Sequence, residues 1–189
     1  MVFPGFGFDQ DAGIVTIPYN FQRDYGVDPF GRQLFNLITD VQMQRAREAF
    51  ELWSHYLGIQ FVETSSSATD DPFAISVVTG DPRAVPAGST VILDASVAWN
   101  DAFGVSDDVQ QTRSWFNEVM KGIGRVLGLE NVPDLPLFEI MGTINGVTQD
   151  QVVDPIYPGN QDIVHGRHLF RNEGRDIDIY RFELTETGR

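Results

Sequence analysis

The feature that most constrains this chain is a helical pattern over residues 39–57 with a recognisable signal at each end. Apolar side chains recur along it at helical spacing, at Ala46, Ala49, Phe50, Trp53, Tyr56 and Leu57. Thr39 can accept a hydrogen bond from the free N–H groups of the first turn, and Gly58 suits the left-handed conformation that ends many helices. We therefore predict an amphipathic helix that must bury one face against other elements.

Four segments around this helix have the β-branched, partly alternating character of strands. They span residues 13–21, 59–63, 73–79 and 90–95. Pro18 lies inside the first of them, and proline is normally confined to edge strands or bulges because it lacks an N–H. We therefore expect that strand to lie at a sheet edge or to carry a bulge, within a small mixed sheet.

A second helical stripe covers residues 106–129. The serine and two aspartates at 106–108 suit a helix N-terminus, and Gly128 is a natural stop. Gly122 and Gly124 lie inside the stripe, where each costs about 1 kcal/mol relative to alanine. Helix propensity gives no reason for them. The order strand, helix, three strands, helix predicts an α+β domain.

Composition narrows the function classes. Thirteen Lys and Arg residues against 27 Asp and Glu residues give a net charge of −14, which disfavours a nucleic-acid partner. Cysteine is absent, which excludes disulfides, thiolate zinc sites and cysteine nucleophiles. No run of 18 apolar residues occurs, so we expect no membrane span. A metal site or acid–base pair would have to use carboxylates or the histidines, His55, His165 and His168.

The second helix ends in Lys-Gly-Ile-Gly-Arg-Val-Leu-Gly-Leu-Glu-Asn, residues 121–131. This stretch resembles the H-E-x-x-H-x-x-G-x-x-H zinc motif of the metzincin proteases, in particular the matrixin and serralysin branches. In that motif three histidines bind zinc and the glutamate acts as general base on the zinc-bound water. The scaffold positions match at Ile123, Gly124, Leu127, Gly128 and Leu129.

The chemical positions of the motif do not match. By the resemblance, Lys121 and Arg125 stand where the first two zinc ligands would be, and Asn131 stands at the third. Gly122 occupies the position of the general base. The resemblance therefore implies a helix that cannot hold zinc in the family manner and has no catalytic glutamate.

Lys121 and Arg125 are one turn apart on one helix face, where two cations would repel a divalent ion. They could pair instead with Glu118 or Glu139; a solvated face is the alternative. A register that begins at Asn117 and Glu118 supplies no histidine either, and it breaks the match of the glycine turn.

The resemblance extends beyond the helix. Met141 follows Asn131 by ten residues and resembles the methionine turn that lies beneath the zinc in metzincins. A first helix and the strands before the motif come in the order of the family, so the likeness covers roughly residues 10–145. It implies a twisted sheet, two long helices and a cleft, in a zincin-like domain that we place at residues 1–148.

The C-terminal part resembles a different module. Residues 163–166 and 175–184 are similar to the opening strands of bacterial pre-peptidase C-terminal domains, which are β-sandwiches appended to secreted proteases. Strict alternation over 176–184 also predicts a strand. We assign 149–189 to a linker and a β-strand tail. We expect a fragment of a larger exported bacterial protein, secreted or at the cell surface; alternatively, these strands close onto the first domain.

Other metal ligands are sparse. We interpret His55 as a surface or half-buried packing residue, and His165 and His168 as part of a surface turn, since two ligands without a third rarely make a catalytic site. Acidic residues that could bind calcium are Asp70, Asp71, Asp101, Asp107, Asp108, Asp176 and Asp178. None has the spacing of a calcium loop, so capping and solvated roles are the alternative. We expect no zinc and no other cofactor, and leave calcium open.

These inferences predict an inactive metzincin-like domain that binds a peptide or protein, or has a structural role. Substrates of the family add a strand to a sheet edge, which we expect here at residues 73–79 and 90–95. One alternative is an active metallopeptidase or other hydrolase with a different ligand set. Another is an adhesion or spacer domain in which the cleft has no role.

Overall fold

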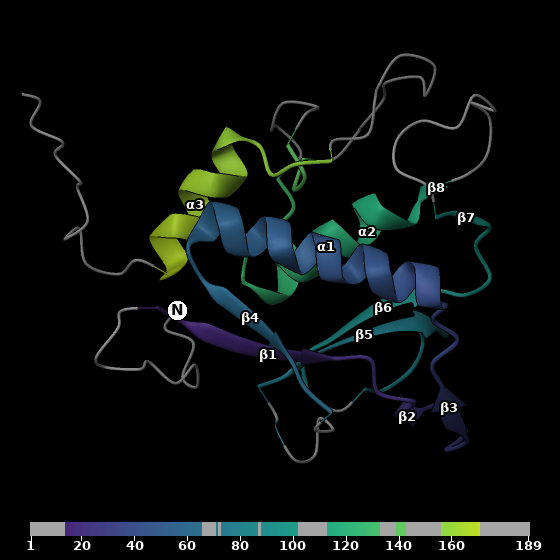
Figure 1. Ribbon diagram of the computed structural model, residues 1–189. Coiled ribbons are helices and arrows are strands. Elements are labelled where there is room, and N and C mark those ends of the chain that lie inside the picture. The colour runs from purple at the N-terminus through teal and green to yellow at the C-terminus, as the bar shows by residue number, and fades with distance from the viewer. Residues whose placement is uncertain are drawn as a thin grey trace, which may run out of the picture.

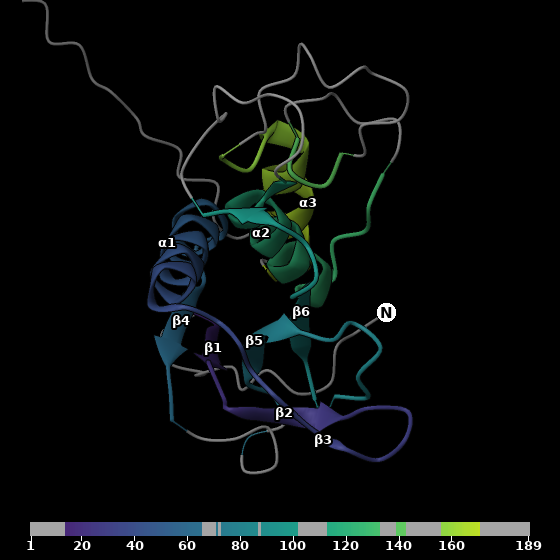
Figure 2. The ribbon, with the colours of Figure 1, turned by 90° about the vertical axis from the view of Figure 1, so that its right-hand side faces the viewer.

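The computed structural model describes residues 14–65, 71, 73–86, 88–101, 113–132, 139–142 and 156–170. In chain order the elements are β1 (Thr16–Asn20), β2 (Asp24–Val27), β3 (Gln33–Phe35), α1 (Asp40–Leu57), β4 (Gln60–Glu63), β5 (Ile75–Gly80), β6 (Thr90–Asp94), β7 (Trp99–Asn100), β8 (Arg113–Ser114), α2 (Trp115–Val126) and α3 (Asn160–Phe170). The helices lie on one face of the sheet, and β2 and β3 lie on the other side (Figures 1 and 2). This arrangement confirms an α+β fold. None of the described helices is both long enough and apolar enough to cross a bilayer.

The main sheet has the order β4-β1-β5-β6, and all its strands are parallel, so the expectation of a mixed sheet was wrong. The expected edge position of the first strand was also wrong, because β1 is interior. The carbonyls of Val15 and Tyr19 accept hydrogen bonds from β4 and the residue that follows it. The backbone groups of the alternate residues of β1, which include Pro18, therefore face β5. The N–H that proline lacks would point toward β5, whose pairing with β1 begins only at Tyr19. The proline costs no ladder bond there.

Helix α1 begins and ends where the sequence predicts. Thr39 accepts a hydrogen bond from the backbone N–H of Gln42, whose side chain accepts one from the Thr39 N–H, which completes a capping box. Gly58 ends the helix with φ of 67°. The buried face of α1 packs against β4 and α2. Phe50 in this face stacks on Tyr19 of β1, with ring centroids 4.1 Å apart.

Helix α2 is shorter than predicted. Ser114 is its N-cap and accepts a hydrogen bond from the N–H of Asn117, so the helix begins at Trp115 rather than at 106. Residues 113 and 114 form β8 instead. The predicted first turn, at 106–108, lies outside the described residues. The buried face of α2 lies over β5 and β6.

Residues 160–170 form α3, so the strand expected at 163–166 and the turn expected at His165 and His168 were both wrong. The helix packs against α1. A Cβ on Gly166 would collide with Leu57, and Arg167 Nε donates to the carbonyl of Tyr56 at 2.8 Å. The strand predicted at 176–184 lies outside the described residues.

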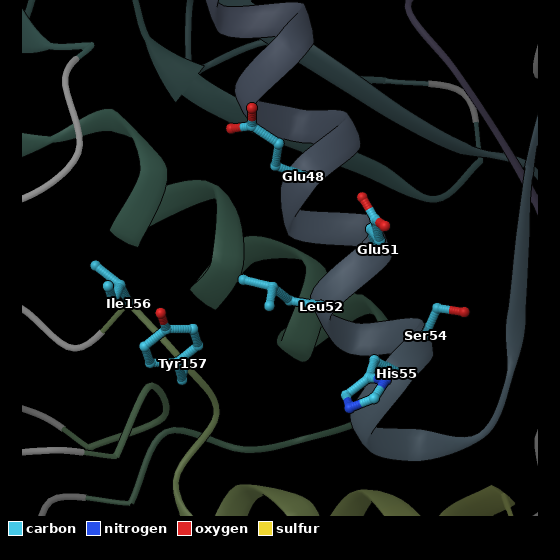
Figure 3. A pocket seen from close by; sticks show the side chains of 7 residues that line it. All are labelled: Glu48, Glu51, Leu52, Ser54, His55, Ile156 and Tyr157. Atoms are coloured by element: carbon cyan, nitrogen blue, oxygen red, sulfur yellow. The ribbon is translucent and has the colours of Figure 1, made fainter.

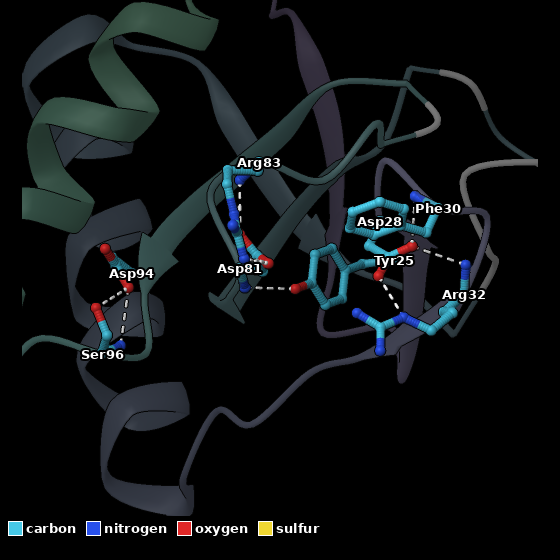
Figure 4. Close-up of polar contacts among 8 residues, drawn as sticks. All are labelled: Tyr25, Asp28, Phe30, Arg32, Asp81, Arg83, Asp94 and Ser96. Atoms are coloured by element: carbon cyan, nitrogen blue, oxygen red, sulfur yellow. Dashed lines mark hydrogen bonds and ion pairs between the residues drawn. The ribbon is translucent and has the colours of Figure 1, made fainter.

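The antiparallel pair β2–β3 was not predicted from the sequence. Tyr25 anchors it: the side chain is buried, and its hydroxyl accepts a hydrogen bond from the N–H of Asp81 at 2.6 Å (Figure 4). The connection between the strands is closed by Asp28, which accepts from the N–H groups of Phe30 and Arg32 at 2.8 Å each. These bonds, the Arg32 N–H first, hold the pKa of Asp28 below its ordinary value.

A polar cluster ties β1, α1 and β4 together. Arg47 donates to both carboxylate oxygens of Glu63, at 2.8 and 3.0 Å, and the Tyr19 hydroxyl donates to Glu63 at 3.2 Å. Burial raises the pKa of Tyr19 to about 12, and the Glu63 charge adds to the effect. The hydrogen bonds from Arg47 in turn hold the pKa of Glu63 below its ordinary value.

This cluster predicts a loss of stability in alkali. In the unfolded chain Tyr19 ionises near its ordinary pKa of 10.0, but in the folded protein it stays neutral until about 12. Its contribution to stability is therefore constant below pH 10 and falls as the pH rises from 10 to 12. Urea titrations at pH 9, 10, 11 and 11.5 should show a shallower alkaline loss for Tyr19→Phe than for the wild type. Equal slopes would contradict the prediction.

Candidate functional site

The candidate site lies along α2, at the residues whose sequence resembles the metzincin motif. Trp53 of α1 fixes this helix: its indole N–H donates to the carbonyl of Met120 at 3.1 Å, and its ring is fully buried. Met120 and Ile123 fill the core on the same side. Lys121 and Arg125 are left on the opposite, less buried side of the helix.

The structure explains the two glycines inside α2. A Cβ on Gly122 would collide with Cγ1 of Val91 on β6. A Cβ on Gly124 would lie 2.6 Å from Sδ of Met141 and 3.2 Å from the Trp53 ring. A side chain at either position would force a neighbouring side chain to move, and glycine lets α2 approach β6 at one point and the turn at Met141 at the other.

The three positions at which the resemblance would place zinc ligands carry polar contacts. Arg125 Nε donates to Oδ1 of Asn131 at 3.4 Å, so the structure brings the second and third positions together. The first position, Lys121, has its Nζ 3.8 Å from Oε1 of Glu118. Of the two expected acidic partners, Glu118 pairs with Lys121. Glu139 does not, because it is used elsewhere.

Glu139 caps helix α3. It is buried, and its carboxylate accepts hydrogen bonds from the N–H groups of Gln161 and Asp162, the shortest at 3.1 Å. A Cβ on Gly159 would collide with this carboxylate. An acidic side chain at a helix N-terminus satisfies otherwise free donors and interacts well with the helix dipole.

Asp162 makes the reciprocal contact to the turn that contains Met141. Its buried carboxylate accepts from the N–H groups of Ile140 at 2.6 Å, Met141 at 3.2 Å and Gly159 at 3.0 Å. Burial raises the pKa of Asp162, against the effect of these three N–H groups. Glu139 and Asp162 together hold the turn under α2 against the start of α3.

The alternative register of the motif is incompatible with the fold. It would place ligands at Asn117 and Leu127, but both residues are buried in the protein. Leu127 belongs to the hydrophobic core, so its position cannot contribute to a site that also includes Lys121 on the outer side of α2.

The histidines do not converge. His165 and His168 are exposed on α3, and His55 is exposed on α1, edge-to-face with Tyr56 at 5.2 Å between ring centroids. Within the described ranges no three His, Asp or Glu side chains are grouped so that they could hold a metal ion.

Two of the acidic residues that could bind calcium by their chemistry can be placed. Asp71 accepts from the N–H of Phe73 at 3.1 Å in a local turn. Asp101 accepts from the side-chain amide of Gln42 at 3.0 Å. The other candidates, Asp70, Asp107, Asp108, Asp176 and Asp178, lie outside the described residues.

A cavity of about 640 Å³ lies on the outer side of α1, facing the segment before α3 (Figure 3). Its lining comprises Glu48, Glu51, Leu52, Ser54, His55, Ile156 and Tyr157. Ser54 and His55 are adjacent there, but the Ser54 hydroxyl donates to the carbonyl of Ile59 at 2.6 Å. Consecutive helical residues do not face one another, so this pair is not a nucleophile and its base. This cavity was not predicted from the sequence. The pattern that could have indicated it is the helical spacing of residues 48, 51, 52 and 55, which places them on one side of α1.

Strand β6 forms one edge of the main sheet; among the residues that the structure describes, it pairs with β5 alone. The N–H of Ala95 donates to β5, and in a parallel ladder the bonded residues alternate. Ile92 therefore directs its N–H and C=O toward the open edge. The expectation that residues 73–79 also offer an edge was wrong, because β5 is interior.

Comparison with known proteins adds no relative. No protein-family model matches the chain, and no curated protein is significantly similar to it. Function therefore has to be inferred from the site alone.

Proposed function

We propose that this chain is a non-catalytic, metzincin-like domain that binds extended peptide segments along the β6 edge. The observation that carries the proposal is the packing at Gly122. This residue stands where the family has its general-base glutamate, and Val91 fills the space that a side chain would need. Loss of the glutamate is built into the contact between α2 and β6, so restoring it alone would not restore a base.

Two contacts support the metzincin likeness. Gly124, a scaffold position of the motif, lies directly on Met141, the residue assigned to the methionine turn. Arg125 and Asn131, which match two ligand positions, meet in a hydrogen bond. These two positions are six apart in the sequence, so their contact needs the tight turn that the motif glycine, Gly128, provides; its φ is 95°.

The edge of β6 supports the peptide-binding part. Val91 and Leu93 point into the core, whereas Ile92 and Asp94 are half-buried on the alternate register. A partner strand would bond to the backbone of Ile92 and pass beside Val91, where α2 touches the sheet. This surface needs no metal.

Screening a library of linear peptides against the protein tests this function. We expect saturable ligands whose affinity falls at least about 10-fold in Ile92→Pro, because proline removes the edge-facing N–H while leaving the β5 ladder intact. Ile92→Val is the matched control and should bind normally. No saturable ligand, or ligands that are indifferent to Ile92→Pro, would favour a spacer or adhesion role. Turnover of a bound peptide would favour a hydrolase with another site.

A further inference from the structure

Lys121 is a largely buried cation whose hydrogen-bonding capacity is not filled by the described residues. Its side chain is only 15% exposed, and an ammonium group carries three N–H donors. In the described part of the chain its one partner is Glu118, at 3.8 Å, which is an ion pair too long for a hydrogen bond. Burying a charged group with its donors unsatisfied is costly, so this arrangement calls for an explanation.

Arg125 lies one turn further along the same side of α2, and most of its N–H groups also have no acceptor among the described residues. A guanidinium has five N–H groups; toward the residues that the structure describes, Arg125 uses only Nε, on Asn131 at 3.4 Å. The side chain is exposed, so its other donors can reach a ligand. Two such cations side by side, in a chain of net charge −14, form a local site for an anion.

The position of the pair suggests which anion. Gly122 is the residue at which α2 touches Val91 of the edge strand, and Arg125 follows it by three residues, on the adjoining part of the helix surface. The part of α2 that carries the cation pair therefore borders this contact, and a peptide that pairs with Ile92 would run along the neighbouring edge. Planar, forked donors such as guanidinium match the geometry of carboxylates and phosphates. The anionic groups of an unmodified peptide are carboxylates.

We propose that Lys121 and Arg125 bind a carboxylate of the peptide that occupies the β6 edge. The inference rests on the proposed peptide-binding function and names the chemistry of its ligand. The carboxylate is either the C-terminal group of the peptide or an Asp or Glu side chain. Glu118 competes with it for Lys121.

The test uses small probes in pairs: N-acetyl-Ala-Ala as free acid and as C-terminal amide, and N-acetyl-Glu-amide beside N-acetyl-Gln-amide. The readout is the NMR signal of the Arg125 Nε–H group, assigned by its loss in Arg125→Lys. In Arg125→Gln, which lacks this group, the readout is the backbone amide signal of residue 125. We expect a saturable shift with an acid and at least about 10-fold weaker binding of its neutral counterpart. The first pair reports a C-terminal carboxylate and the second a side-chain carboxylate.

Variants sharpen the test. Lys121→Met and Arg125→Gln should each weaken acid binding about 10-fold. Glu118→Gln should strengthen it, because Glu118 no longer competes for Lys121. Arg23→Gln, at an exposed arginine beside the β2–β3 hairpin, is the control and should have no effect. Equal binding of acid and amide, or acid binding unchanged in both Lys121→Met and Arg125→Gln, would overturn the proposal. Ile92→Pro should weaken library peptides only and leave the small acids unaffected, so failure of the β6 edge is distinguishable from failure of the carboxylate site.

Discussion

Replacing Trp53 with alanine is expected to lower the free energy of unfolding by about 4 kcal/mol, a large part of the stability of an ordinary domain. The side chain is fully buried between α1 and α2. Its removal leaves a cavity and also deprives the Met120 carbonyl of the indole N–H, which lies at 3.1 Å. Urea unfolding followed by far-ultraviolet circular dichroism measures the change.

Trp53→Phe is the matched control for this prediction. Phenylalanine keeps much of the apolar volume and loses the hydrogen bond, so we expect a loss of about 2 kcal/mol. A Gly124→Ala substitution should be less harmful in the Trp53→Ala background than in the wild type, because the Trp53 ring lies 3.2 Å from the added Cβ. A loss below about 1 kcal/mol for Trp53→Ala would show that this ring does not position α2.

Replacing Asp162 with alanine is expected to cost about 3 kcal/mol, because three backbone N–H groups lose their acceptor at once. The loss should be local as well as global. Hydrogen exchange of the Met141 amide should accelerate more than that of amides in α1. Asp71→Ala, which removes a turn contact near the surface, is the control and should cost about 0.5 kcal/mol.

Asp162→Asn separates the charge of this group from its geometry. One amide oxygen can replace part of the acceptor set, so the loss should be roughly half that of alanine. Burial raises the pKa of Asp162 above its ordinary value of 3.8. The contribution of this group to stability is therefore complete below pH 3.8 and is lost as the pH rises from there through the raised pKa, whereas the amide of asparagine does not titrate. The gap between the two proteins should therefore be widest at low pH. A gap that widens with rising pH would contradict this.

Local signals in the sequence were enough to predict several elements. Helix α1 carries both of its end signals, Thr39 and Gly58, within the pattern itself, so its bounds were predicted closely. Strands β4, β5 and β6 fall within one or two residues of their predicted ranges. β5 is buried along its whole length and β6 alternates between buried and half-buried residues, whereas β4 has no buried residue and was predicted from its partly alternating pattern after Gly58. Such elements are specified by residues close together in the sequence.

Elements that depend on distant contacts were missed. The pair β2–β3 is held by Tyr25 against Asp81, 56 residues away. Helix α3 has a mid-helix glycine, Gly166, that is needed only because Leu57 of α1 lies against it. Pro18 indicated an edge, but its effect depends on where β5 begins to pair, which no local pattern shows.

The site was predicted in part for the same reason. Spacing placed Lys121 and Arg125 on one helix side and suggested Glu118 as a partner, which the structure shows. The role of Glu139 at α3 could not be predicted, because α3 itself was not. The reason for Gly122 emerged only when Val91 was found against it.

We propose above that α2 and the turn at Met141 keep the framework of a zinc protease whose metal positions have been replaced. Substituting Lys121→His, Arg125→His and Asn131→His together tests this most directly, with zinc binding measured by isothermal titration. All three positions lie at least partly at the surface, so the fold should tolerate the changes. The pair Lys121→His and Arg125→His, which leaves Asn131 unchanged, is the control.

We expect one zinc per chain for the first set, bound on the order of 100-fold more tightly than by the wild type, and more tightly than by the control with two histidines. Three histidines in tetrahedral reach of one ion would explain that gain. If the first set folds and still binds zinc no better than the wild type, positions 121, 125 and 131 do not share a metal-site geometry. The metzincin-like interpretation of this chain would then be wrong.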